Sequence, residues 1–202
     1  MGSGSGTGAL TILGFTCSVS LIGLFVAPPL ISRCLFRPYW LVRRAEYGRL
    51  IASGFVHADV GHLVFNAITF YSFAFSLERY IGTTGFLALY FVGLIFGNVG
   101  TYIKHRSDPD YATLGASGAI LAVLFASIVY FPSQHLFILP IPVPIPAPLF
   151  ALGYLAYSYY SARQSRGRIN HDAHLGGALA GLVYVALTDP DAYSHLMAVA
   201  FG

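Results

Sequence analysis

Long apolar runs separated by short polar connections dominate this chain of 202 residues. A helix crosses the core of a bilayer with about 20 apolar residues, within a range of roughly 17 to 25. Six stretches of the sequence reach or approach that length, and each is predicted as a membrane-spanning helix. They lie at about 9–31, 62–75, 85–103, 115–131, 149–161 and 174–187.

The connections between these stretches carry signals that end helices. Pro28-Pro29 closes the first stretch and Asp189-Pro190 closes the last, because a helix interior tolerates proline poorly. Residues 78–84 are predicted to form a tight polar turn. Residues 140–148 read PIPVPIPAP, and a proline at every second position excludes a helix. We expect extended backbone there, at the membrane interface or against protein.

The connection from 33 to 59 is long and contains five arginines together with Tyr39 and Trp40. Aromatic rings beside arginines are typical of a segment that lies at the membrane interface. By contrast, residues 1–8 have only the composition of a linker, so we expect a flexible leader or a cloning remnant outside the fold. The sequence thus predicts a single domain over residues 9–202.

Composition agrees with a membrane protein. Hydrophobic residues make up 56% of the chain and charged residues 9%, whereas a soluble domain has about 25% charged residues. This composition also excludes disorder, and the net charge of +3 includes no basic stripe dense enough for nucleic acid. Two cysteines, Cys17 and Cys34, make no disulfide framework. We predict an all-α membrane protein.

Gly115-Ala116-Ser117-Gly118 opens the fourth predicted helix. Small residues there are compatible with close helix packing or a flexible turn. A serine in the first helical turn, however, lies among free backbone N–H groups at the positive end of the helix dipole. That place can stabilise an oxyanion, so Ser117 is a candidate nucleophile.

His171-Asp172-Ala173-His174 opens the sixth predicted helix and is followed by Gly177 and Gly181. His174 and the two glycines share one helix face, where small residues allow another helix to approach closely. His174 is therefore predicted to point at that partner, although a histidine hydrogen-bonded at a helix end is an alternative. Asp172 is predicted as the N-cap, and His171 is a rival base on the same element.

His57, His62 and Asn66 lie at the entry of the second predicted helix, with Asp59 as its N-cap. His62 and Asn66 share a helix face, and a polar packing network is the alternative reading. All three clusters lie at the starts of even-numbered helices, so they belong to one side of the membrane. Together they supply a nucleophile, a base and hydrogen-bond donors for an oxyanion.

These motifs as a set resemble the rhomboid intramembrane serine proteases. The resemblance covers residues 33–187 and includes Glu46-x-x-Arg49 and Glu78-(x3)-Gly82. It implies a six-transmembrane-helix rhomboid-like bundle whose long first loop lies in the membrane plane. It also implies that the fifth helix gates lateral entry of substrate.

The resemblance implies a role for each candidate residue. Ser117 would be the nucleophile, and His174 would be the general base and then the acid for the leaving amine. His62, Asn66 and the backbone N–H of Ser117 would form the oxyanion hole. The supporting positions would be His57, Gly115, Gly118, Gly177 and Gly181. The implied activity is cleavage of other membrane proteins in or near their transmembrane segments, without a cofactor, in the bacterial cytoplasmic membrane.

Position 121 departs from the pattern of the family. Similar proteins commonly carry Phe or Tyr four residues after the serine, where the ring packs beside the catalytic histidine. This chain has Leu121 there, and a leucine cannot stack on an imidazole. We therefore expect the orientation of the histidine to differ from the pattern.

Two alternative functions stay open. In the first, a metal enzyme would use His57, His62, His171 and His174 as ligands, although the sequence contains no His-Glu-x-x-His motif. In the second, a catalytically silent relative would bind membrane proteins, but such relatives usually lack the serine or the histidine.

The side of the membrane that the site faces is a separate question. Ten of the eleven Lys and Arg residues lie in connections on the site's side, which by the positive-inside rule would face the cytoplasm. Bacterial proteins similar to this one usually have an outward-facing site, and we expect the same here. Membrane lipid is a further expected partner, and the oligomeric state is not predicted.

Overall fold

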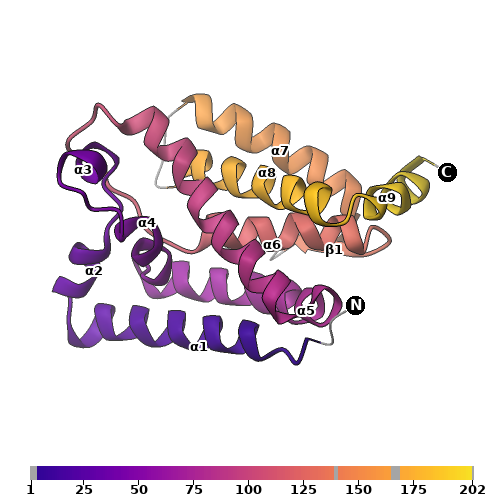
Figure 1. Ribbon diagram of the computed structural model, residues 1–202, viewed down its shortest axis with the longest axis horizontal. Coiled ribbons are helices and arrows are strands. Elements are labelled where there is room, and N and C mark those ends of the chain that lie inside the picture. Colours follow the sequence, from indigo (N-terminus) through magenta and orange to yellow (C-terminus); the bar gives the residue numbers. More distant parts are fainter. Residues whose placement is uncertain (1–3, 139–140, 165–168, 202) are drawn as a thin grey trace.

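The structure is a computed structural model that describes residues 4–138, 141–164 and 169–201. It is mostly helical (Figure 1). The helical elements are α1 (Thr7–Leu21) with its π-helical extension η1 (Ile22–Val26), α2 (Pro29–Cys34), α3 (Pro38–Arg43), α4 (Arg49–Ala52), the 3₁₀-helix η2 (Ser53–Phe55), α5 (Val60–His105), α6 (Ser117–Tyr130), α7 (Ala147–Gln164), α8 (His171–Thr188) and α9 (Asp191–Phe201).

Helix α5 comprises two predicted stretches joined at one residue. Gly82 has φ 78° and ψ 158° inside a helix of 46 residues, a conformation that glycine adopts at little cost. The chain reverses its direction there, so the part of α5 before Gly82 and the part after it run in roughly opposite directions (Figure 1). The tight turn predicted over 78–84 is therefore confirmed in its place, but it is narrower than predicted, because helix continues up to Gly82 and directly after it.

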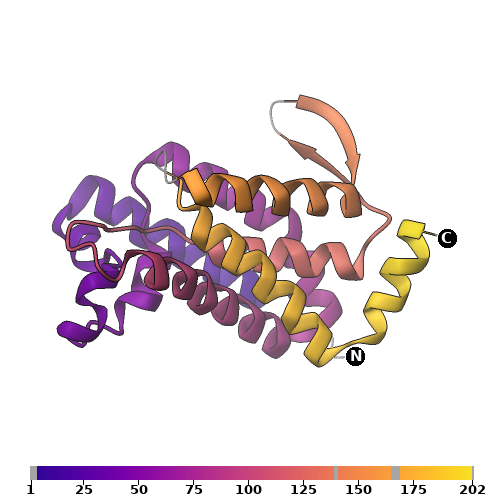
Figure 2. The ribbon, with the colours of Figure 1, turned by 90° about the horizontal axis from the view of Figure 1, so that it is seen from above.

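The bundle is built around α6. Every residue of α6 from Gly118 to Tyr130 is buried, and α5 and α8 pack against it. Helix α1 packs along α5, and α7 lies along the outer side of α8 (Figures 1 and 2). Helix α6 thus occupies the centre of the fold, and its first residue is Ser117.

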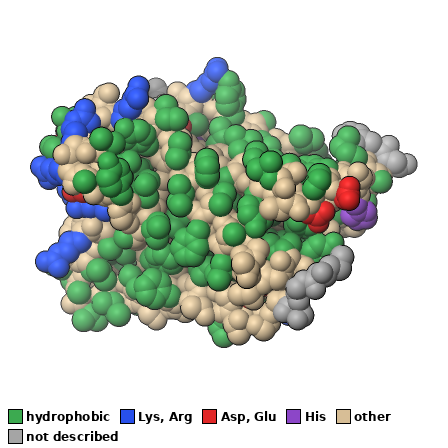
Figure 3. Space-filling view, in the orientation of Figure 1, with side chains coloured by type: hydrophobic (Ala, Val, Ile, Leu, Met, Phe, Trp, Pro, Cys, Tyr) green, Lys and Arg blue, Asp and Glu red, His purple; other side chains and the backbone are tan. Residues whose placement is uncertain are grey.

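The surface of the bundle is apolar. Large hydrophobic side chains are exposed on α1, α5, α7 and α8, and they cover much of the face in Figure 3, with Lys and Arg gathered toward the end that carries α2 and α3. Residues 7–26 and α5 are each long and apolar enough to cross a membrane. An apolar belt with charges at its end is the surface expected in a bilayer.

The N-terminus of α1 is held by a buried carboxylate. The N–H groups of Gly8 and Ala9 donate to Glu78 at 3.0 and 2.7 Å, and the Thr83 hydroxyl donates at 2.7 Å. A negative charge is stabilised at a helix N-terminus. The leader predicted over 1–8 is thus too long, since Thr7 and Gly8 belong to α1; residues 1–3 lie outside the described residues.

The long first connection is folded. Phe36 forms an isolated bridge with Thr113, and Glu46 pairs with Arg49 at 3.1 Å. The guanidinium groups of Arg43 and Arg44 lie over the rings of Tyr39 and Trp40, 3.9 and 3.7 Å from the ring centroids. These contacts fix the connection against the ends of the bundle helices.

The proline-rich stretch is extended and paired. Strands β1 (His135–Ile138) and β2 (Ile141–Pro146) form an antiparallel hairpin, with Leu136 opposite Ile145 and Phe137 opposite Pro144. The hairpin projects from the bundle near the start of α7 (Figure 2). The exclusion of a helix is confirmed for 141–146, whereas Ala147 and Pro148 already belong to the first turn of α7. The hairpin was not predicted, and it corrects the all-α expectation. Pro140 lies outside the described residues.

Candidate active site

Helices α6 and α8 touch through their backbones at five small residues. A Cβ atom added to Gly177 would overlap the carbonyl of Gly118, and one added to Gly181 would overlap the carbonyl of Ala122. A Cβ on Gly118 would lie 3.2 Å from the carbonyl oxygen of Ala173. Ser117 precedes Gly118 and His174 follows Ala173, so the two candidate residues lie on adjoining turns of touching helices.

Ser117 is half-buried and lies in the first turn of α6, as predicted, although the helix begins at Ser117 rather than near 115. The preceding Ala116 offers no side-chain cap, so the side chains of the described residues leave the first-turn N–H groups uncapped at this point. Gly115 has φ 114°, a conformation that other residues rarely adopt. The tight approach to α6 therefore depends on a glycine at 115.

His62 and Asn66 lie beside Gly115. A Cβ atom on Gly115 would lie 2.9 Å from Cε1 of His62 and 4.0 Å from Nδ2 of Asn66. Asn66 is only 6% exposed, and its Nδ2 has no hydrogen-bond partner among the described residues. Because a buried unpaired donor is costly, this amide is available to an acceptor that enters the site.

His174 is held through one ring nitrogen. Its Nδ1 lies 2.9 Å from the hydroxyl oxygen of Tyr154 on α7. This bond leaves Nε2 for other chemistry. In the described part of the chain, Ser117 Oγ makes no hydrogen bond to His174; such bonds are often long without substrate and tighten in the complex.

His57 lies behind His62. It is fully buried, its Nδ1 is 2.9 Å from Ser20 Oγ, and its ring packs edge-on against His62 at a centroid distance of 4.8 Å. Burial lowers the pKa of His57 to about 4. The neighbouring His62 also lowers this pKa, whereas the carboxylate of Asp59 raises it. His57 is therefore neutral near pH 7, and it supports the His62 ring rather than carrying charge.

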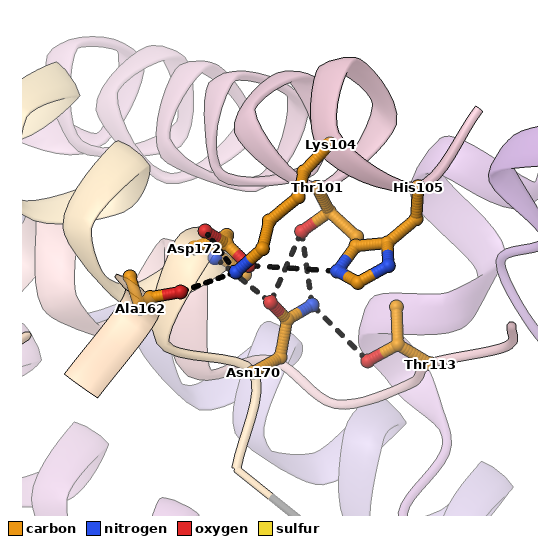
Figure 4. A network of polar contacts seen from close by, with 8 residues as sticks. Thr101, Lys104, His105, Thr113, Ala162, Asn170 and Asp172 are labelled. Atoms are coloured by element: carbon orange, nitrogen blue, oxygen red, sulfur yellow. Dashed lines mark hydrogen bonds and ion pairs between the residues drawn. The ribbon is translucent and has the colours of Figure 1, made fainter. Parts of the chain in front are cut away.

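A polar network fixes the start of α8 (Figure 4). Asn170 is the N-cap: its Oδ1 accepts from the N–H of Ala173 at 3.1 Å, and its Nδ2 donates to Thr101 and Thr113. Asp172, predicted as the cap, instead pairs with Lys104 at 3.0 Å.

The helix begins three residues earlier than predicted, at His171. The acid at 172 is therefore already inside the first turn, and it also lies 3.6 Å from His105. Asp59 does cap α5, as predicted, by accepting from the N–H of His62 at 2.8 Å.

The ring of His171, the alternative base, packs near the rings of His174 and Tyr157. Its ring lies 5.9 Å from that of His174, nearly perpendicular, and 5.4 Å from that of Tyr157. The metal alternative meets no ligand cluster: across residues 4–138, 141–164 and 169–201, no three His, Cys, Asp or Glu side chains are grouped to hold an ion.

Tyr154 was not identified from the sequence. It lies in a run of four tyrosines within seven residues, and nothing in the local pattern distinguishes it from Tyr157, Tyr159 or Tyr160. In the structure Tyr154 packs with the cluster that contains Leu121 and Phe125. The aromatic ring that position 121 lacks is thus supplied from α7.

The chain resembles known proteins over most of its length. The Rhomboid domain model matches residues 44–190. The rhomboid protein YdcA of Bacillus subtilis is 39% identical over 52% of this chain and 54% of its own length. RHOMBOID-like protein 12, mitochondrial, of Arabidopsis thaliana is 32% identical over 66% of this chain and 44% of its own.

A zebrafish (Danio rerio) relative, presenilin-associated rhomboid-like protein A, mitochondrial, is 30% identical over 91% of this chain and 49% of its own length. The chain thus spans about half the length of these relatives. Rhomboid proteins form multi-span membrane bundles, include serine proteases and act on membrane proteins. The chain belongs to the rhomboid family.

Proposed function

We propose that this protein is an intramembrane serine endopeptidase that crosses the membrane six times and cleaves other membrane proteins in or near their transmembrane segments. The backbone contact of Gly118 with Ala173 and Gly177 carries the proposal. It keeps Ser117 and His174 on adjoining turns, beside the unpaired amide of Asn66.

In the acylation step, Ser117 Oγ attacks the carbonyl carbon of the scissile peptide bond. His174 Nε2 takes the hydroxyl proton, and the carbonyl oxygen becomes an oxyanion. Asn66 Nδ2, His62 and the N–H of Ser117 donate to that oxyanion, at the positive end of the α6 dipole. His174 then gives its proton to the leaving amine, and the C–N bond breaks.

In the deacylation step, water attacks the acyl-enzyme ester. His174 takes a proton from the water and returns it to Ser117 Oγ as the ester bond breaks. One base therefore serves both halves of the reaction. No step requires a cofactor.

The substrate must reach this site from the side. Residues of α7 are mostly exposed or half-buried, and only Ala147 and Ser158 of its 18 residues are buried. Among α1, α5, α6, α7 and α8, helix α7 buries the fewest residues, so it can move aside with the least loss of packing. Because a peptide bond in a helix is shielded, the substrate segment has to unwind before it reaches Ser117.

A fluorophosphonate probe and a cleavage assay test the dyad together. Ser117→Ala and His174→Ala should each abolish cleavage of a model transmembrane substrate, and Ser117→Ala should abolish labelling. The two losses should not add, because each removes the same activated nucleophile. Ser127→Ala, on the same helix, and His195→Ala, on α9, are matched controls that should retain both signals.

Substantial cleavage by purified Ser117→Ala or His174→Ala would contradict the mechanism. A wild-type protein that is neither labelled nor active would favour the silent, binding relative instead. Asn66→Ala should slow cleavage by about 10²–10³-fold without abolishing it, as removal of one oxyanion donor does.

We also propose that the protein resides in a bacterial cytoplasmic membrane with its active site facing outward. The bacterial relative supports the location. The folded first connection supports the orientation, because the positive-inside rule applies to short free loops. There, Arg43 and Arg44 lie on aromatic rings and Arg49 is paired. Arg166 and Arg168, which oppose it, lie outside the described residues.

Single cysteines at exposed positions on opposite ends test this orientation. In a background without Cys17 and Cys34, Ser107→Cys should react with an impermeant maleimide in intact cells. Ser133→Cys should react only after the membrane is broken, and the cysteine-free parent should not react. The reverse pattern would establish that the site faces the cytoplasm.

A further inference from the structure

Tyr154 is the α7 side chain that reaches the proposed base. Its hydroxyl oxygen lies 2.9 Å from His174 Nδ1, and the two rings are inclined by only 25° at a centroid distance of 6.5 Å. We propose that Tyr154 is a positioning residue for His174, and that through it the activation of Ser117 depends on how α7 is seated. This inference rests on the proposed protease function.

The phenol ring is itself firmly placed. Phe125 of α6 packs against it at a centroid distance of 5.9 Å, and Phe150, one turn earlier on α7, stacks on it at 5.6 Å. These rings hold the hydroxyl group within hydrogen-bond distance of Nδ1 of His174. The position of the hydroxyl therefore follows the position of α7 on the bundle.

The chemistry of the dyad needs an acceptor at this nitrogen. When Nδ1 carries the proton and donates it to a neighbouring oxygen, Nε2 keeps the lone pair that can take the serine proton. Once His174 is protonated, the Nδ1–H still requires an acceptor. The Tyr154 oxygen meets this need in both states, whereas the carboxylate of Asp172 is engaged by Lys104.

The bond links two parts of the molecule that are packed very differently. His174 lies on α8, which is in backbone contact with α6. Tyr154 lies on α7, which buries two of its residues. A shift of α7 away from the bundle removes the Nδ1 acceptor before it disturbs the α6–α8 contact. Substrate entry with α7 displaced and chemistry with α7 returned are therefore separate states.

Tyr154→Phe tests the bond, because it removes the hydroxyl group and keeps the ring packing. Two kinetic measurements are made on the purified full chain. The first is phosphonylation of Ser117 by a small fluorophosphonate: the Ser117 Oγ–P bond forms, the P–F bond breaks, fluoride leaves and His174 takes the proton. The second is kcat and KM for a transmembrane substrate. Tyr160→Phe, an exposed position on the same helix, is the matched control.

If Tyr154 positions the base, Tyr154→Phe lowers the phosphonylation rate and kcat by the same factor, roughly ten- to a hundredfold, and leaves KM unchanged. The small probe carries no transmembrane segment that has to unwind, so a loss of its rate reports on the dyad rather than on substrate unwinding. Tyr160→Phe keeps wild-type values and unfolds at the wild-type temperature. Tyr154→Phe stays folded because it keeps the ring packing, but it unfolds at a slightly lower temperature, since His174 Nδ1 loses its partner.

Two results would overturn the inference. An unchanged phosphonylation rate with altered cleavage would assign Tyr154 to substrate entry alone, and unchanged values throughout would give its hydroxyl no role. Failure of the proposed function looks different, because the wild-type chain would then be neither labelled at Ser117 nor able to cleave.

Discussion

Helices α6 and α7 both approach His174, but they are built in contrasting ways. Helix α6 buries each residue from Gly118 to Tyr130 and meets α8 through glycine and alanine, with backbones in contact. Helix α7 exposes large apolar side chains such as Leu149 and Leu152, and it meets α8 through aromatic rings. The α6 side of the site is therefore rigid, whereas on the α7 side the contacts with the bundle can be exchanged for contacts with lipid or substrate.

This difference separates two requirements of the proposed chemistry. A nucleophile and its oxyanion donors must be placed within tight limits, and the contact of small residues places Ser117 with little freedom. The scissile bond of a membrane-embedded substrate must also reach the site. Helix α7 is held by a few aromatic contacts and one hydrogen bond, so it can be displaced during entry and then pack again. Only the orientation of His174 depends on both sides.

The largest effect is expected from a substitution that disrupts the contact between α6 and α8. In Gly177→Ala the added methyl group would overlap the carbonyl of Gly118, so α6 and α8 have to separate. Overpacking of this kind costs about 1–3 kcal/mol, and we expect the upper end because backbone cannot rotate away. Thermal unfolding of the purified protein should occur at a clearly lower temperature, with loss of Ser117 labelling.

The matched control is Gly153→Ala on α7, where no atom lies within 4 Å of the added methyl group. A helical glycine costs about 0.5–1 kcal/mol relative to alanine, so this variant should be slightly more stable and as active as the wild type. Equal destabilisation by both substitutions would remove the contrast between the two helices.

A smaller effect is expected at the boundary between the two sides. Leu121 is 6% exposed and belongs to the cluster that includes Phe125 and packs against Tyr154. Leu121→Phe adds a ring to a filled site, so it should displace Tyr154 and lower the phosphonylation rate several-fold. Leu152→Phe, on the exposed face of α7, should change nothing. A higher rate in Leu121→Phe would indicate that a ring at 121 can take over the role of Tyr154.

Features set by local sequence could be predicted, and those set by distant partners could not. The place of Ser117 in the first turn of α6, the Asp59 cap and the close glycine contact on α8 follow from neighbouring residues and helical spacing. The choice of Asn170 over Asp172 as cap depends on Thr101 and Thr113, which lie far away in the chain. The roles assigned to Ser117, His174, His62 and Asn66 stay predictions until the variants are measured.

Two further features depend on tertiary contacts. The reversal at Gly82 follows from the polar residues around it, but the sequence does not reveal that Glu78, held by Thr83, binds the start of α1. Tyr154 is one tyrosine among four, and only the packing of α7 on α8 selects it. The sequence carries no information on which of these rings reaches His174.

The proline-rich hairpin has a consequence for self-association. Pro144 and Pro146 alternate with Ile145, so β2 can pair with β1 only if the residues that lack an N–H are directed to the opposite edge. That outer edge then offers carbonyl acceptors without the matching donors. A strand from another copy cannot complete a ladder there, and a small exposed sheet is prevented from acting as a template for aggregation along that edge.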